Sequence, residues 1–135
     1  MALVVPDARE VDVLTDLLTS ALTLKLYSND VTPSGASLAG DFTEVAGGGY
    51  ANKPLTFANW GITPGNPTVA LYNATQSFVF TGPTNAPGTI YGYYVTRNSD
   101  GLLIFAQRFA AGIAPFSPIA GSNIRITPRI TCHGG

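Results

Sequence analysis

The chain is poor in the side chains that carry most enzyme chemistry. Its 135 residues include one cysteine, Cys132, and one histidine, His133, and the two are adjacent. A single cysteine excludes an internal disulfide, and two neighbouring ligands are too few for a zinc site. A Ser–His or Cys–His relay would depend on His133 alone. The sequence therefore favours a protein that is not an enzyme and that holds no metal or other cofactor.

Charged side chains are scarce as well. Asp, Glu, Lys and Arg make up 11% of the residues, against roughly 25% in an average globular protein. The net charge is −1 and the bases form no cluster, which argues against a nucleic-acid partner. No apolar run is long enough for a membrane-spanning helix, and residues 1–10 lack the pattern of a signal peptide. We therefore expect neither a nucleic acid nor a membrane among its partners.

Apolar and turn-forming residues are plentiful by comparison. Hydrophobic residues account for 45% of the chain, which is enough for a packed core. The 15 glycines and 10 prolines predict many turns. The composition therefore predicts a turn-rich, weakly charged globular fold.

Residues 1–20 differ in pattern from the rest of the chain. They are acidic, and their apolar residues recur at helical spacing after Pro6 and Asp7, which fit a helix start. We predict an amphipathic helix over residues 7–19, with an apolar stripe formed by Val11, Leu14, Leu17, Leu18 and Leu22. This stripe must be covered, either by the protein's own core or by a neighbouring molecule. We accordingly divide the chain into an N-terminal arm and helix, residues 1–20, and a β domain, residues 21–135.

From residue 22 onward the apolar period changes from helical to two. Leu22, Leu24 and Leu26 alternate with Thr23 and Lys25, which predicts a half-buried strand. Further short strands, separated by Gly, Pro and Asn turns, are predicted over residues 42–45, 53–60, 68–73, 76–81, 89–97, 102–109 and 123–132. This spacing predicts a mainly β fold, an antiparallel β-sandwich or a jelly-roll-like barrel with one short N-terminal helix.

For two of these strand regions, the sequence also predicts how the strand is placed in the fold. The hairpin over residues 89–109, with Asp100-Gly101 in its turn, is apolar on both faces, so both faces must be covered. The opposite sheet would cover one face, and the N-terminal helix or a second subunit the other. In the last strand, Pro128 interrupts a regular alternation, which indicates an edge position or a bulge.

Three other features are candidate sites. Asp30, Asp41 and Glu44 could bind calcium or act as glycosidase carboxylates, but they lack the spacing of a calcium loop, and we interpret them as surface acids. The run 47–49 of three glycines is not followed by phosphate-loop residues and indicates a hinge or bulge. The six tyrosines and Trp60 could form a sugar-binding platform, although their strand propensity favours the core or a subunit interface.

Five segments of the chain carry a resemblance to a known family. They are VVPDAREVDVLTDLLTSA (4–21), LTLKLYSNDVTPSGAS (22–37), FTEVAGGGYA (42–51), IYGYYVTRNSDGLLIFAQRF (90–109) and IRITPRIT (124–131). Together they resemble small virion proteins of tailed bacteriophages, in which an N-terminal helix precedes a compact β domain. These motifs are structural rather than catalytic, so the resemblance implies a structural component of the virus particle.

Within that family we expect a capsid decoration, or cement, protein. It would be a homotrimer that binds the major capsid protein on the outer shell and stabilises the seams between capsomers. The residues expected to dock on the capsid are Val4, Val5, Val11, Leu14 and Leu18, and those expected in the subunit interface are Tyr91, Tyr93, Phe105 and Phe109. The alternatives are a tail or neck component and a host-glycan-binding module of a tail fibre or spike.

Overall fold

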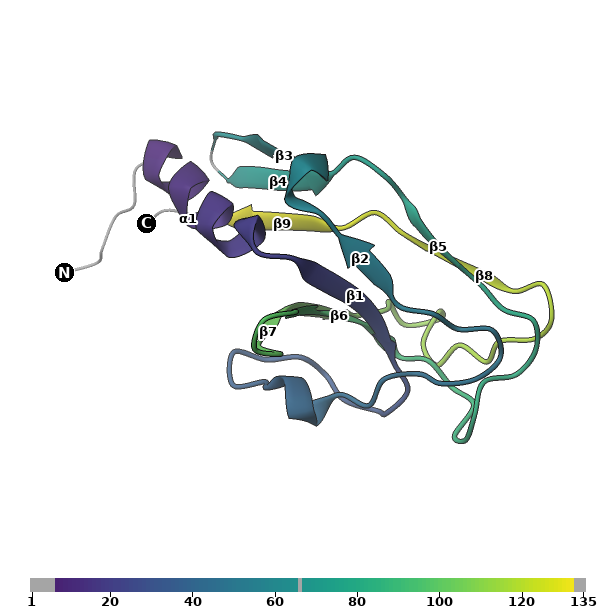
Figure 1. Cartoon of the computed structure of the whole chain (residues 1–135). Coiled ribbons are helices and arrows are strands. Elements are labelled where there is room, and N and C mark those ends of the chain that lie inside the picture. Colours follow the sequence, from purple (N-terminus) through teal and green to yellow (C-terminus); the bar gives the residue numbers. More distant parts are fainter. Residues whose placement is uncertain (1–6, 66, 133–135) are drawn as a thin grey trace.

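A computed structural model describes residues 7–65 and 67–132, and these residues form a mainly antiparallel β structure with a single α-helix (Figure 1). The elements are α1 (Asp7–Thr19), β1 (Leu22–Tyr27), the 3-10 helix η1 (Ala39–Asp41), β2 (Lys53–Leu55), the 3-10 helix η2 (Phe57–Asn59), β3 (Trp60–Thr63), β4 (Thr68–Tyr72), β5 (Gln76–Val79), β6 (Gly92–Arg97), β7 (Leu103–Arg108), β8 (Asn123–Ile126) and β9 (Arg129–Cys132). The predicted fold class, a β-sandwich-like fold with one short helix, is confirmed.

The strands form two layers with the core between them. One layer is a four-stranded sheet in the order β2-β1-β6-β7. The other contains the sheet β3-β4-β9 and its continuation, the pair β5-β8. The two parts meet where the Tyr72 N–H donates to the Pro128 carbonyl over 2.9 Å. The core cluster draws side chains from both layers, among them Leu22, Leu24, Leu26, Ala70, Tyr72, Phe78, Phe80, Val95 and Ile126.

The helix α1 closes one end of this sandwich (Figure 1). It contacts β3 and β4, and its stripe residues Leu14 and Leu18 are buried in the main core cluster. Glu10 on the same helix is also fully buried, and its Oε2 accepts a hydrogen bond of 2.6 Å from the Thr68 hydroxyl of β4. Of the two covers considered for the apolar stripe, the protein's own core is the one observed, because helix and sheet share one hydrophobic cluster.

Two predicted strands differ from the observed ones. Residues 42–45 make only a single bridge, between Tyr27 and Glu44, and the predicted strand 53–60 is divided into β2, η2 and the start of β3. The division has a geometric cause: β2 belongs to one layer and β3 to the other, so the chain must turn between them. Asn59 stabilises this turn, since its Nδ2 donates to the Thr56 hydroxyl.

The second face of the 89–109 hairpin is covered by the chain's own segment 28–45, and neither by α1 nor by a second subunit as expected. Tyr94 of β6 stacks on Phe42 at a centroid distance of 5.0 Å, and Tyr27 meets Phe42 edge-on at 4.9 Å. The Tyr27 ring also lies across β6 at Gly92, where a Cβ would come within 2.7 Å of the Tyr27 hydroxyl. Only glycine admits this close approach.

The prediction for Pro128 is confirmed. The last strand region is interrupted at Thr127 and Pro128, which separate β8 from β9, and each of these strands pairs on one side only. The apolar face predicted for residues 123–132 is also observed. Ile126 is buried, Ile124 and Ile130 pack against the core, and Arg125 and Arg129 are exposed.

Because Leu18 is 0% exposed, truncating it should leave a cavity at the helix–sheet contact. We expect Leu18→Ala to lower the free energy of unfolding by about 2–5 kcal/mol. Val13 on the same helix is 51% exposed, so Val13→Ala should change stability by no more than about 0.5 kcal/mol. Chemical denaturation of the three proteins measures both effects. Equal losses in the two variants would show that α1 is not packed as described.

Candidate functional site

The acidic residues of the sequence do not form a site. Asp30 pairs with Arg108, the Asp41 carboxylate accepts from the Leu38 N–H over 2.9 Å, and Glu44 Oε2 accepts from the Tyr50 hydroxyl over 2.7 Å. Each carboxylate thus stabilises a local turn or contact. Within residues 7–65 and 67–132, no group of three or more His, Cys, Asp or Glu side chains is placed to hold a metal ion. The one helix described there is too short and too polar to cross a membrane.

The aromatic residues that could have formed a sugar platform lie largely inside the domain. The Trp60 ring is buried, meets Tyr72 edge-on at 5.1 Å and approaches Phe105 at 6.5 Å. Tyr50 stacks on Phe78 at 5.9 Å. This arrangement agrees with the interpretation of these side chains as core residues.

The residues expected in a subunit interface are also used within the fold. Tyr93 is 7% exposed, and its hydroxyl donates to Gln107 Oε1 over 2.8 Å. Phe105 and Phe109 pack against the core, and both approach the Tyr93 ring. Tyr91 lies under the Arg108 guanidinium, 4.9 Å from the ring centroid. These four rings are therefore engaged within the fold, with Tyr93 buried and the other three half-buried.

Most of the described residues that were expected to dock on the capsid are also buried within the fold. Leu14 and Leu18 are buried in the core and Val11 is half-buried. Val4 and Val5 lie outside the described residues. The apolar stripe of the helix therefore has little exposed surface with which to bind a partner.

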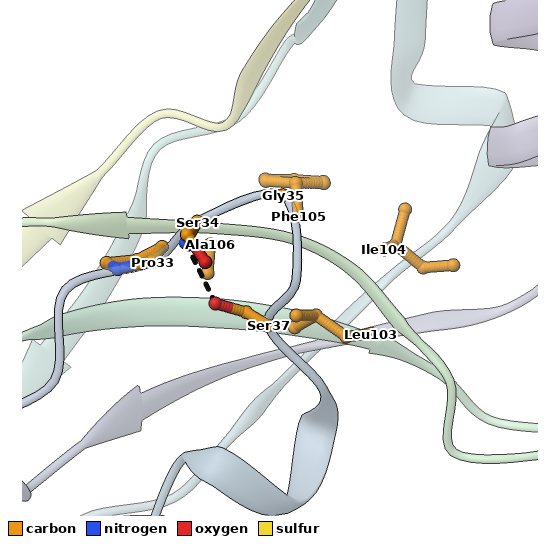
Figure 2. A pocket seen from close by; sticks show the side chains of 8 residues that line it. All are labelled: Pro33, Ser34, Gly35, Ser37, Leu103, Ile104, Phe105 and Ala106. Atoms are coloured by element: carbon orange, nitrogen blue, oxygen red, sulfur yellow. Dashed lines mark hydrogen bonds between the residues drawn. The ribbon is translucent and has the colours of Figure 1, made fainter.

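A groove that sequence reasoning missed runs along β7 (Figure 2). Its volume is about 460 Å³, and it is lined by Pro33, Ser34, Gly35, Ser37, Leu103, Ile104, Phe105 and Ala106. Four consecutive strand residues cannot all point to one face, because side chains alternate along a strand. A hollow that touches all four must therefore lie beside the edge of β7, with the loop 33–37 as its other wall.

The edge of β7 itself is unpaired in this structure. Among the described strands, β7 pairs only with β6. Phe109 donates to the Tyr91 carbonyl, so the alternation of antiparallel pairs places Ala106, opposite Tyr94, in a non-hydrogen-bonded pair. The N–H and C=O of Ala106 thus point away from β6. An unpaired apolar edge of this kind is a template for another strand.

The groove wall is held in place by side chains on the outer face of the sheet, the face that segment 28–45 covers. Arg108 on β7 donates to Asp30 over 2.6 Å and to the Val31 carbonyl over 3.3 Å. Tyr27 donates to the same carbonyl over 3.1 Å, and the amide of Asn29 bridges residues 41 and 43. Within the loop, the Ser34 N–H donates to the Ser37 hydroxyl (Figure 2). These bonds order the segment that forms the groove.

A second surface is formed at the end of the sandwich opposite α1 (Figure 1). Three loops meet there, residues 46–49, 81–89 and 110–122, and we call them the uncharged tip. The Thr81 N–H of the second loop donates to the Gly48 carbonyl of the first, and the N–H of Ile90, which directly follows the second loop, donates to the Phe116 carbonyl of the third. Neither residues 54–96 nor residues 109–124 contain an Asp, Glu, Lys, Arg or His. The tip therefore carries no charged side chain.

Apolar side chains project from the uncharged tip. Ile113 is 55% exposed and Ile119 is 66% exposed. Prolines 83, 87 and 115 are exposed beside them. A charge-free surface with exposed isoleucines is the composition found at the centre of protein interfaces. The long uncharged stretches are visible in the sequence, but only the fold brings them to one end.

The aromatic cluster behind the groove predicts a sensitivity to alkaline pH. Burial raises the pKa of the Tyr94 hydroxyl to about 12, with a further contribution from Glu44. The unfolded chain loses this proton near its ordinary value of 10.0, so the folded state binds more protons between the two values and stability falls as pH rises through them. We expect Tyr94→Phe to lose less stability than the wild type between pH 10 and about 12. Denaturant unfolding at pH values on both sides of this window measures the difference, and parallel losses would contradict it.

Comparisons with known proteins identify no relative. No protein-family model matches the chain, and no curated protein or solved structure is significantly similar to it. The candidate sites of this protein are therefore two surfaces of its own fold, the groove along β7 and the uncharged tip.

Proposed function

We propose that the protein is a non-enzymatic structural component of a tailed-bacteriophage particle, and that it acts as a capsid decoration protein. The observation that carries this proposal is the uncharged tip, with Ile113 and Ile119 exposed on it. The five sequence segments resemble virion proteins of tailed bacteriophages, and this resemblance is the reason for proposing a phage particle. The engagement of Asp30, Asp41 and Glu44 in local contacts supports a role without catalysis.

The tip suits docking on a large protein surface. Burying a charged side chain at an interface costs free energy unless a partner compensates it, whereas apolar and neutral groups avoid that cost. The tip buries no charge on docking, so apolar contact contributes directly to affinity. A protein that binds the assembled shell and not its dissociated subunits stabilises the shell by mass action, by about 2.7 kcal/mol per site at a free concentration 100 times Kd.

The proposal moves the docking surface from the N-terminal helix to the opposite end of the domain. The helix stripe is buried in the core, so it has little apolar surface left for a partner. The glycan-binding alternative loses its main support in the same way, because Trp60 and Tyr72 face the interior.

The test is co-sedimentation with shells of the phage that encodes this chain, prepared without the protein. We expect saturable binding and a rise in the temperature at which the shells dissociate. Ile119→Asp should weaken binding at least tenfold, because it places a charge in the apolar contact. Leu38→Asp is the matched control, since Leu38 is 68% exposed and Ile119 is 66% exposed, but Leu38 lies away from the tip.

Two results would contradict the proposal. Binding that is lost equally in Leu38→Asp and Ile119→Asp would remove the tip as the docking surface. Absence of binding to shells, together with binding to purified tails, would replace the decoration role by the tail role.

A further inference from the structure

The edge of β7 and the groove beside it indicate what kind of segment could bind there. The outward N–H and C=O of Ala106 require backbone groups in extended conformation opposite them. The loop 33–37 stands across the groove from this edge, so the space between them suits one added strand better than the edge of a second sheet. An added strand would pair with β7 and place alternate side chains into the groove.

The residues that line the groove indicate the charge and polarity of the strand that would fit it. None of its eight lining residues is charged, and four of them, Leu103, Ile104, Phe105 and Ala106, are apolar strand residues. β7 also has no proline or lysine, two residues that protect an edge, and its one charged residue, Arg108, is paired with Asp30. The strand that fits here is short, uncharged and apolar.

The chain contains one such segment outside the described residues. Residues 2–5 read Ala-Leu-Val-Val, are uncharged, and contain two β-branched residues, Val4 and Val5. Pro6 follows and precedes α1. We propose that residues 2–5 of one copy add as a strand to the β7 edge of a second copy, in the groove bounded by residues 33–37.

This exchange has a defined consequence for assembly. Each copy would offer one segment and one edge, so the contact is head-to-tail and closes into a ring when the rotation permits. The inference concerns self-association and does not depend on the phage assignment. It makes Val4 and Val5 contact residues between copies of this chain, a different role from the capsid docking expected of them.

Light scattering coupled to size exclusion tests the proposal on the full chain. We expect the wild type to be an oligomer with a mass that is a whole multiple of 14.1 kDa. Ala106→Pro should reduce it to a monomer, because proline removes the outward N–H while the ladder to β6 does not use that group. Ala106→Ser keeps the N–H and should remain oligomeric. Circular dichroism on heating verifies that each variant is folded.

Two further variants keep the test decisive if Ala106→Pro does not fold. Gly35→Trp adds a large side chain at a residue that lines the groove, where a Cβ meets nothing within 4 Å, and Gly35→Ala is its control. The double variant Val4→Asp/Val5→Asp alters the added strand instead. Both should be monomers, and a mixture of Gly35→Trp with the double variant should form a one-to-one dimer of twice 14.1 kDa, since each partner retains one intact half of the contact.

Three outcomes would overturn the inference. The first is a wild type that stays monomeric at every concentration up to its solubility limit. The second is an oligomer lost in the edge and groove variants but retained in Val4→Asp/Val5→Asp, which would assign direct pairing of β7 with β7. The third is an oligomer unaffected by all of these changes, which would place the contact elsewhere.

Discussion

The structure depends on the burial of β6 on both of its faces. One face packs against the opposite layer through Tyr93 and Val95, and the other receives the aromatic cluster of Tyr27, Phe42 and Tyr94. The cluster forms because Gly92 lets the Tyr27 ring lie across the strand. It fixes the segment 28–45 on the outer face of the sheet, and that segment carries the loop 33–37 to the edge of β7. The position of the groove therefore depends on this packing.

The two surfaces differ in what they could recognise. The edge of β7 presents backbone hydrogen-bonding groups in a row, so it selects for an extended chain and only weakly for its side chains. The uncharged tip presents exposed isoleucines and prolines, so it selects for a complementary apolar surface. We propose self-association for the first surface and docking on a particle for the second.

Part of the protein's charge lies on α1, away from the uncharged tip. Arg9, Asp12 and Asp16 lie on α1, at the end of the sandwich opposite the tip, and Arg9 pairs with Asp12 over 2.8 Å. Charges near the groove are neutralised locally, as in the pair of Arg108 with Asp30. With so few charged residues in the chain, their placement leaves large surfaces neutral. Neutral surfaces lower the cost of desolvation wherever a partner binds.

The sequence by itself determined much of the local structure, although not the strands expected over residues 42–45 and 53–60. The period-two leucines of β1, the helical spacing of α1, the Asp100-Gly101 turn and the interruption at Pro128 all have local causes, and the predicted mainly β fold with one helix followed from them. Tertiary structure decided what covers each apolar face, because that depends on contacts between distant residues. Phe42 reaches Tyr94, and Leu14 and Leu18 enter the core, through long-range packing that no local pattern encodes. The groove and the uncharged tip arise from the same packing, since each is made of segments far apart in the chain.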